Sequence, residues 1–446
     1  MKLGLKVFLL ALIVRVFNLY FLDLNEDSYL VEDQKFYWEW SLNFAYLPWG
    51  EIPKNILSER MPGSFLFFEA IQWLTNKNMF WVLIIQAVMD SFTCVIISSC
   101  AYMINNRYGL YTGLFASFSP LLITISSQIL SDTIFLFTFV SSLFFILKYN
   151  YSSKKEYYIV LSGLFLGITT FIRASTFPFI FLSLPIIYFV LRSQKNKKLP
   201  RVLILLFLFL FSALGPILPR LYDNIVSNNS FALTSQAGSH VAYWMVPGVL
   251  LFTKGFNRES ALNYVNTEID KVGGLNGDSY KDSKIMMDVS IKIISNQNIL
   301  ITAYTWIRSS ILNTITTPIL IDNRVRSMKH PSFANETGVK SWLYNLFLNK
   351  EYLQYTNVVI ISLFVTIFSF ITFFYGFYVF FKDNHILSLL SLCIVIYFCI
   401  ITGPTISPKY CLPYAPIIFY LQAIFLDKLM LFCKKKKIWL ILRKAQ

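Results

Sequence analysis

The sequence predicts an all-α polytopic membrane protein, a bundle of about ten and up to twelve transmembrane helices with two long outer loops. Hydrophobic residues make up 56% of the 446 residues and charged residues only 14%, and the mean hydropathy is +0.56. Because a soluble globular protein carries charge on about a quarter of its residues, these values exclude that class. Long unbroken apolar runs favour helices over a transmembrane β-barrel, whose strands give short alternating segments.

Ten apolar runs of roughly 18 to 25 residues are long enough to cross a bilayer as helices. They lie near residues 5–22, 78–102, 109–126, 131–148, 157–173, 175–191, 202–219, 357–381, 386–402 and 411–427. The first run is too long for the apolar part of a signal peptide and lacks a small-residue cleavage site, so we expect a retained helix. Segment 297–322 is apolar enough for a further span, but Asn298, Arg308 and several threonines favour a re-entrant or interfacial helix.

The distribution of charge predicts how the helices are oriented. With the N-terminus in the cytoplasm, the inner connections and the C-terminal tail are strongly basic, whereas acids and bases nearly balance in the outer segments. The formal net charge of +15 then lies on one face, as the positive-inside rule requires. This distribution explains the charge without nucleic-acid binding. We expect an integral protein of a bacterial inner (plasma) membrane whose outer loops face the periplasm.

This topology divides the chain into three segments. Residues 1–219 form an N-terminal transmembrane module with an acidic first outer loop at 23–77. Residues 220–355 form a large, partly helical outer loop region, and residues 356–446 form the C-terminal transmembrane helices with a basic cytoplasmic tail. Loops of this length are usually folded or functional. The three histidines argue against a multi-histidine metal centre.

Charged residues near the outer ends of the helices are the candidates for chemistry. The first outer loop holds four clustered carboxylates: Glu26, Asp27, Glu32 and Asp33. A carboxylate at a membrane surface can act as a general base or bind a divalent cation, although acidic runs are often only solvated surface. Arg60 can hold a phosphate through two hydrogen bonds, or can anchor the chain in the interface. Arg173 lies between two apolar helices, where an arginine is costly unless it pairs with an acid or meets an anion.

The later helices and the large loop add further candidates: Asp132, Arg220, His240, Lys409 and Tyr410. Asp132 also suits the first turn of a helix, where the helix dipole favours an acid. His240 also fits an ordinary loop histidine, and Lys409 also fits a charge at a helix end that reaches for the interface. The topology places the acids and bases on one side of the membrane, which suggests chemistry on a lipid phosphate.

Two charges fall inside apolar runs instead. Arg15 lies in the first run and Asp90 in the second. A charge within the bilayer is costly unless it is paired, so we expect these two side chains to form a structural bridge.

Six motifs, in the same order along the chain, resemble those of the GT-C glycosyltransferases, in the protein O-mannosyltransferase-like and aminoarabinose-transferase-like branch (glycosyltransferase family 39-like). They are DQKFYWEWS (33–41), ERMPGSFLFFEAI (59–71), QAVMDSFTCVI (86–96), SQILSDTIFLF (127–137), GLFLGITTFIRAS (163–175) and SPKYCLPYAPIIFY (407–420). The chain departs from the family pattern where Asp132 replaces Glu and Lys409 replaces Arg. The segment PRLYDN (219–224) only approximates the motif P-W-x-x-R-N.

The resemblance implies a GT-C-like bundle and an inverting transfer of a sugar from a polyprenyl-phosphate-linked donor to a lipid, glycan or protein acceptor on the periplasmic or lumenal face. It implies that Asp33 is the general base. The donor phosphate would be bound by Arg60, Arg173, Lys409 and Tyr410. Further substrate contacts would come from Tyr37, Asp132, Arg220 and His240. No cofactor is required, and a divalent cation near Asp33 and Asp132 is left open.

Two other functional classes stay open at this point. A flippase or transporter for lipid-linked glycans would also be basic, polytopic and helical, but transporters concentrate polar residues and broken helices at the bilayer midplane. An O-antigen ligase or polymerase-type enzyme would depend on a loop led by arginine and histidine. The acidic first loop and the charges at helix ends favour the glycosyltransferase. The sequence does not identify the sugar, the acceptor or the polyprenol.

Overall fold

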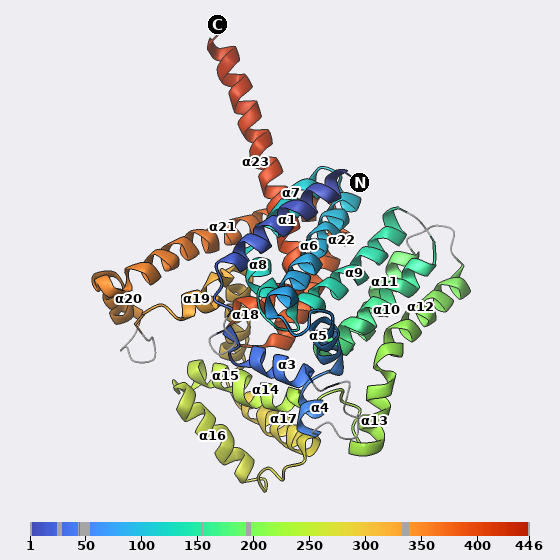
Figure 1. The fold of residues 1–446 in the computed structure, drawn as a ribbon, viewed down its shortest axis with the longest axis vertical. Coiled ribbons are helices and arrows are strands. Elements are labelled where there is room, and N and C mark those ends of the chain that lie inside the picture. Colours follow the sequence, from blue (N-terminus) through green and yellow to red (C-terminus); the bar gives the residue numbers. More distant parts are fainter. Residues whose placement is uncertain are drawn as a thin grey trace.

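The computed structural model is an assembly of helices around a central bundle (Figure 1). It describes residues 2–24, 29–42, 44, 54–152, 155–192, 198–331 and 339–444. No β-strand occurs in these ranges, so the predicted all-α class is confirmed. Glu26 and Asp27, which belong to the acidic cluster of the first outer loop, lie outside the described residues.

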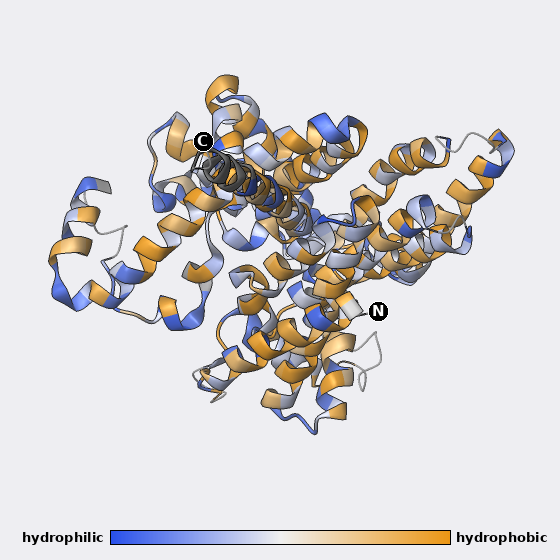
Figure 2. Cartoon of the chain, turned by 90° about the horizontal axis from the view of Figure 1, so that it is seen from above, coloured by the Kyte–Doolittle hydropathy of each residue, from blue (hydrophilic) through white to orange (hydrophobic). Residues whose placement is uncertain are grey.

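The N-terminal half supplies most of the bundle. Its helices are α1 (Lys2–Tyr20), α6 (Met79–Ile104), α7 (Tyr108–Ser117), α8 (Pro120–Ser126), α9 (Asp132–Tyr151), α10 (Tyr157–Ile172), α11 (Phe177–Arg192) and α12 (Leu199–Leu214). The most extensive interfaces join α9 to α10, α10 to α12 and α6 to α9. Hydrophobic residues lie along most of the bundle helices, and hydrophilic residues lie at many of the connections (Figure 2).

The C-terminal part of the chain completes the bundle with three helices and a short 3₁₀ segment. These are α21 (Leu353–Asp383), α22 (His385–Thr402), η7 (Pro408–Tyr414) and α23 (Ala415–Lys444). α23 packs against both α21 and α7, so the two ends of the chain belong to the same bundle.

Within the described residues, eight helices are long and apolar enough to cross a membrane, and nine if the bent α7–α8 pair is one span. The predicted run at 157–173 contains α10, whose 16 residues are fewer than such a span requires. Segment 297–322 contains α18 (Ile299–Ile315), which is not among the candidate spans. The integral membrane class is therefore confirmed, whereas the expected number of about ten spans is not.

A break separates α7 from α8, and the two helices meet at 49°. Pro120 occupies the first position of α8, where its missing N–H costs nothing. The Ser119 hydroxyl accepts a hydrogen bond from the backbone N–H of Leu122 and caps the new helix. The sequence Ser-Pro thus ends one helix and starts another inside an apolar run that we expected to be continuous.

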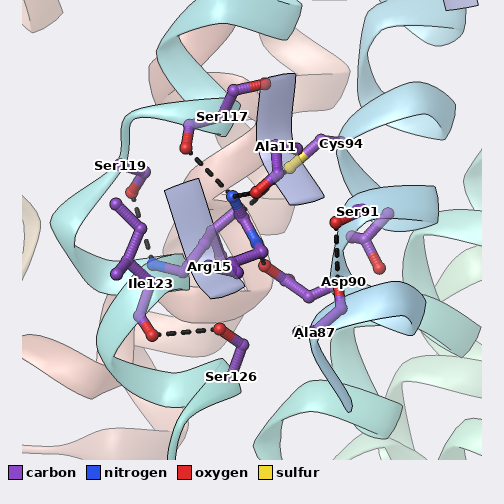
Figure 3. Close-up of polar contacts among 12 residues, drawn as sticks. Ala11, Arg15, Ala87, Asp90, Ser91, Cys94, Ser117, Ser119, Ile123 and Ser126 are labelled. Carbon is purple, nitrogen blue, oxygen red and sulfur yellow. Dashed lines mark hydrogen bonds and ion pairs between the residues drawn. The ribbon is translucent and has the colours of Figure 1, made fainter. Parts of the chain in front are cut away.

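The predicted bridge between Arg15 and Asp90 is confirmed, and it lies beside this break (Figure 3). The Arg15 guanidinium pairs with the Asp90 carboxylate and donates from Nη1 to the carbonyl of Ser117, at 3.0 Å. Its Nη2 lies 3.2 Å from Cys94 Sγ. Both charged side chains are almost completely buried, at 1% and 3% exposure. Arg15 therefore ties α1 to α6 and satisfies a carbonyl at the end of α7.

A layer of four helices lies at the end of the bundle opposite the two chain termini (Figure 1). These helices are α14 (Gln236–His240), α15 (Val246–Thr253), α16 (Arg258–Asp270) and α17 (Ser279–Ser295), with a π-helical turn, η3 (Val241–Met245), between α14 and α15. Their apolar side chains form a separate cluster that includes Ala242, Leu250, Val265 and Ile293. We call residues 236–295 the α14–α17 layer. α13 (Leu218–Asn228) connects it to α12.

Candidate functional site

Asp33 and Arg60, both predicted as site residues, form an ion pair. Asp33 begins α3 (Asp33–Ser41), and Arg60 lies just before α5 (Pro62–Leu74). The Arg60 Nη2 atom is 3.3 Å from Asp33 Oδ1, and the two side chains are 21% and 52% exposed, respectively. The carboxylate is thus paired with a cation and half exposed.

Aromatic packing fixes α3 against α5 and so determines where Asp33 lies. Tyr37, one turn after Asp33, is buried, with its ring centroid 5.4 Å from that of Phe65 and 6.0 Å from that of Phe68. The side-chain amide of Gln72 donates a hydrogen bond to the carbonyl of Trp38 at 3.1 Å. Tyr37 therefore helps to pack α3 against α5, and its predicted substrate contact stays a prediction.

α5 begins in direct contact with the end of α10, the helix that precedes Arg173. Gly63 lies against the carbonyl of Phe171, and the Ser64 hydroxyl donates a hydrogen bond to the carbonyl of Ile172 at 3.1 Å. Arg60 is four residues before Ser64, and Arg173 directly follows Ile172. This contact sets the position of one arginine relative to the other.

Replacing Gly63 with alanine is expected to destabilise this contact. A Cβ atom at residue 63 would be 2.6 Å from the backbone oxygen of Phe171. Because a backbone group cannot rotate away, we expect a loss of about 1–3 kcal/mol in stability, measured by thermal unfolding in detergent. Gly215→Ala is the matched control, since nothing lies within 4 Å of its added Cβ. Equal melting temperatures for the two variants would contradict the close contact.

Arg173 forms the second ion pair of the site, with Asp132 at the start of α9. The Arg173 Nη2 atom is 3.1 Å from Asp132 Oδ1 and 2.9 Å from the hydroxyl oxygen of Ser131. Its guanidinium carbon also lies 5.0 Å from the ring centroid of Phe135. The Asp132 side chain is 4% exposed, whereas that of Arg173 is 36% exposed. The carboxylate thus holds the guanidinium from the protein side and leaves its other edge accessible.

Uncharged residues hold the turn that leads into Asp132. The side-chain oxygen of Gln34 accepts a hydrogen bond from the N–H of Ile129 at 3.1 Å, and the amide of Gln86 donates to the carbonyl of Gln128 at 3.0 Å. Gln34 directly follows Asp33, so the first loop is tied to the turn before α9. Gln34 is not among the residues predicted from the sequence, although it stands next to the predicted base, because its partner is a backbone N–H far along the chain.

η7 contributes Lys409 and Tyr410. The hydroxyl groups of Tyr37 and Tyr410 lie close enough to the Arg173 guanidinium to interact with it electrostatically, so η7 and α3 both approach this arginine. Within the described part of the chain, no carboxylate forms an ion pair with Lys409.

α18 supports the turn that carries Lys409. The Asn313 side chain is buried, donates to the carbonyl of Thr405 and accepts from the N–H of Ser407, both at 2.8 Å. One amide side chain thus bonds a carbonyl and an N–H of the turn before η7 and fixes its conformation.

The two remaining candidates are placed differently. Arg220 is 3% exposed, and its guanidinium is bonded to Asp223, to the carbonyl of Leu57 and to the hydroxyl of Tyr280. His240 lies at the end of α14, next to the backbone of Thr402. Burial lowers the pKa of His240 below its ordinary value, opposed by the backbone hydrogen bond with Thr402, so the ring is neutral at pH 7.

The described residues do not fit a divalent cation at this site. They contain no group of three or more His, Cys, Asp and Glu side chains that could hold a metal ion, and Asp132 already pairs with Arg173. The site as described therefore contains two ion pairs, Asp33 with Arg60 and Asp132 with Arg173, and the Asp33 carboxylate is half exposed.

Comparison with known proteins places this arrangement in context. Residues 59–218 match the model of the family described as dolichyl-phosphate-mannose-protein mannosyltransferase. The matched segment, about a third of the chain, contains Arg60, Asp132 and Arg173, whereas Asp33 and Lys409 lie outside it. No curated protein sequence matches the chain at a significant level.

Solved structures resemble almost the whole chain. The archaeal oligosaccharyltransferase AglB from Archaeoglobus fulgidus, in complex with an inhibitory peptide and a dolichol-phosphate, superposes with a TM-score of 0.52 at 14% identity, over 99% of this chain and 52% of AglB. The apo form of the Archaeoglobus fulgidus oligosaccharyltransferase gives 0.51 at 13% identity, over 98% and 52% of the two chains. The chain has the GT-C fold.

The GT-C fold implied by the sequence motifs is thus confirmed. The chain spans about half the length of the two oligosaccharyltransferase structures. ArnT from Cupriavidus metallidurans bound to undecaprenyl phosphate gives a TM-score of 0.42 at 14% identity, over 94% of this chain and 76% of ArnT, a score too low to support a common fold by itself. Within the GT-C fold of this chain, α3 and α5 lie between the bundle helices and the α14–α17 layer (Figure 1).

Proposed function

We propose that this protein is a membrane glycosyltransferase. It transfers a sugar from a polyprenyl-phosphate-linked donor to a nucleophile on a lipid, glycan or protein, at the periplasmic face of a bacterial plasma membrane. The observation that carries this proposal is the half-exposed Asp33 carboxylate, paired with Arg60 at 3.3 Å, on a GT-C fold. AglB in complex with a dolichol-phosphate supports a lipid phosphate as the donor group.

Asp33 acts as the general base in this proposal. As the acceptor hydroxyl or amine attacks the anomeric carbon, its proton passes to the Asp33 carboxylate. The bond between the anomeric carbon and the phosphate oxygen breaks, and the electron pair leaves with the polyprenyl phosphate. A single displacement of this kind inverts the configuration at the anomeric carbon, as in inverting glycosidases.

The leaving phosphate needs positive charge more than it needs a proton. Negative charge develops on the phosphate oxygen as the bond breaks, and fixed cations near that oxygen stabilise the transition state. Arg60, Arg173 and Lys409 supply this charge. Arg173 is held by the buried Asp132, and Lys409 has no paired carboxylate in the described structure. Each side chain can therefore point an N–H group at the phosphate.

Part of the donor affinity comes from the lipid tail. Transfer of each methylene group from water to an apolar environment is worth about 0.8 kcal/mol, so a polyprenyl chain supplies ample binding energy along the apolar bundle. The polar residues at the helix ends then determine orientation, which is the usual division of roles in ligand sites.

A donor panel tests the function directly. The purified full-length chain, reconstituted in lipid, is incubated with polyprenyl-phosphate sugars that differ in the sugar, and release of polyprenyl phosphate is followed. We expect release with at least one donor, and its dependence on an added hydroxyl or amine acceptor. If no donor reacts while radiolabelled lipid-linked glycan moves between leaflets, the protein is a flippase and the proposal is wrong.

Replacing Arg60 with alanine is expected to weaken donor binding. The variant removes a cation placed for the phosphate and leaves Asp33 without its partner. Hydrogen bonds to charged groups contribute about 1.5–3 kcal/mol, so the donor KM should rise roughly tenfold to a hundredfold. Lys35→Ala is the matched control, because Lys35 is an exposed cation of α3 that pairs with Glu39, at 3.7 Å. Unchanged donor KM in Arg60→Ala would make this arginine a simple anchor at the interface.

A further inference from the structure

The short helix α4 (Lys54–Glu59), which leads to Arg60, is held from outside at its last turn. The final carbonyls of a helix have no partner within the helix. Here the carbonyl of Leu57 accepts a hydrogen bond from Arg220, and the carbonyl of Ser58 accepts two from Ser235, from its N–H at 2.7 Å and its hydroxyl at 3.1 Å. Both donor residues, Arg220 and Ser235, follow α12 in the sequence.

Arg220 uses both terminal nitrogens of its guanidinium for protein contacts, so neither is left for a substrate. Besides Leu57, Nη2 bonds to the hydroxyl of Tyr280 on α17 at 3.0 Å, and Nη1 bonds to Asp223 at 3.0 Å. Within the described residues, the buried Nε atom has no hydrogen-bond partner. A guanidinium that is 3% exposed and bonded on both terminal nitrogens cannot reach a phosphate without breaking these contacts.

Asn224, one turn after Arg220 on α13, prepares the second donor. It is fully buried, and its Nδ2 atom donates to the carbonyls of Ala232 and Leu233, at 2.7 and 3.1 Å. These bonds fold the chain back so that Ser235 meets Ser58. The segment PRLYDN thus supplies one direct contact and one supporting contact to the residues before Arg60.

We propose that Arg220 and Ser235 are positioning residues that aim Arg60 at the donor phosphate. Arg60 lies between two fixed points, the Ser58 carbonyl held by Ser235 and the Ser64 hydroxyl bonded to Ile172 at the end of α10. The inference rests on the proposed donor-binding role of Arg60. Arg220 then positions Arg60, whereas the sequence predicts that it contacts the substrate. Its hydrogen bond to Tyr280 on α17 couples the α14–α17 layer to the donor site.

We call the hydrogen bonds of Arg220 and Ser235 to the carbonyls of Leu57 and Ser58 the clamp. The first test detects the clamp without any reaction. Hydrogen exchange of residues 56–60 is compared between the full-length protein and its Arg220→Gln and Ser235→Ala variants. Exchange should be at least severalfold faster in both, with the protection of α6 and α9 unchanged. Arg201→Gln is the control, because Arg201 pairs with Glu156 far from α4 in the sequence. Unchanged exchange at 56–60 in the Ser235→Ala variant would overturn the clamp even if Arg220→Gln fails to fold.

The second test separates positioning from substrate contact. Arg220→Gln should raise the donor KM about tenfold with a smaller change in kcat, and Arg220→Lys, which keeps a donor for the Leu57 carbonyl, should recover part of the loss. In an Arg60→Ala background, adding Arg220→Gln should leave the donor KM unchanged, since coupled residues do not act additively.

The two single variants and the double variant form a double-mutant cycle, and its possible outcomes are distinct. If the effects of the two substitutions multiply, Arg220 contacts the donor itself and the positioning role is wrong. If Arg60→Ala alone leaves donor KM unchanged, the proposed role of Arg60 fails and the inference fails with it, whereas the exchange result still reports whether the clamp exists.

Discussion

Replacing Asp33 with asparagine is expected to lower kcat for sugar transfer by about two to four orders of magnitude, the contribution of a positioned general base. Asparagine has nearly the same shape, and its side-chain oxygen can still accept from Arg60, which lies 3.3 Å from the native carboxylate. It cannot take a proton from the acceptor. Donor binding and the fold should therefore persist while transfer stops, measured by single-turnover release of polyprenyl phosphate and by donor titration.

Glu39→Gln is the control for this experiment. Glu39 is an exposed acid on the same helix, and it pairs with Lys35 at 3.7 Å. Neutralising it tests whether loss of any negative charge from α3 slows transfer. Normal turnover by Asp33→Asn would remove Asp33 from its role, and equal losses in both variants would point to a general effect of charge.

The residues at the outer helix ends could be found from the sequence because hydropathy locates helix ends and basic residues indicate the inner face. Asp33, Arg60 and Arg173 were selected in this way. What the sequence could not provide is which side chains meet, since this depends on the lateral order of the helices. The pairing of Arg173 with Asp132, at 3.1 Å, requires α9 and α10 to lie side by side, with the start of α9 and the end of α10 at one level.

Arg220 shows the limit of the same reasoning. A charge at the start of a long loop suggests a substrate contact, and nothing local indicates that the guanidinium will be buried. Its partner is the backbone carbonyl of Leu57, 163 residues earlier in the chain. A backbone acceptor leaves no mark in the sequence, so such a contact is visible only in three dimensions.

The break between α7 and α8 could have been predicted and was not. Ser119 followed by Pro120 is a common start of a helix, with a capping hydroxyl and a proline that lacks an N–H. The count of apolar residues over 109–126 predicts one continuous span, because it ignores the Ser-Pro signal. By contrast, Arg15 and Asp90 were paired correctly, because two opposite charges inside apolar helices have few other ways to be stabilised.

Replacing Arg15 with methionine is expected to destabilise the protein more than any surface change. The substitution leaves the Asp90 carboxylate buried at 3% exposure without its countercharge, and it removes the donor to the Ser117 carbonyl beside the α7–α8 break (Figure 3). Removing one partner of a buried ion pair costs about 3–5 kcal/mol. The change in the free energy of unfolding is measured by denaturant titration in mixed micelles.

The double variant Arg15→Met/Asp90→Leu separates the cost of an unpaired charge from the loss of an attractive contact. Replacing a buried pair with apolar residues of similar volume is often neutral, because neither charge then has to leave water. We therefore expect the double variant to be more stable than Arg15→Met alone, although the Ser117 carbonyl stays without its donor. If the double variant is the less stable of the two, the attraction between the charges outweighs their desolvation, and this pair contributes to stability beyond satisfying two charges that must be buried together.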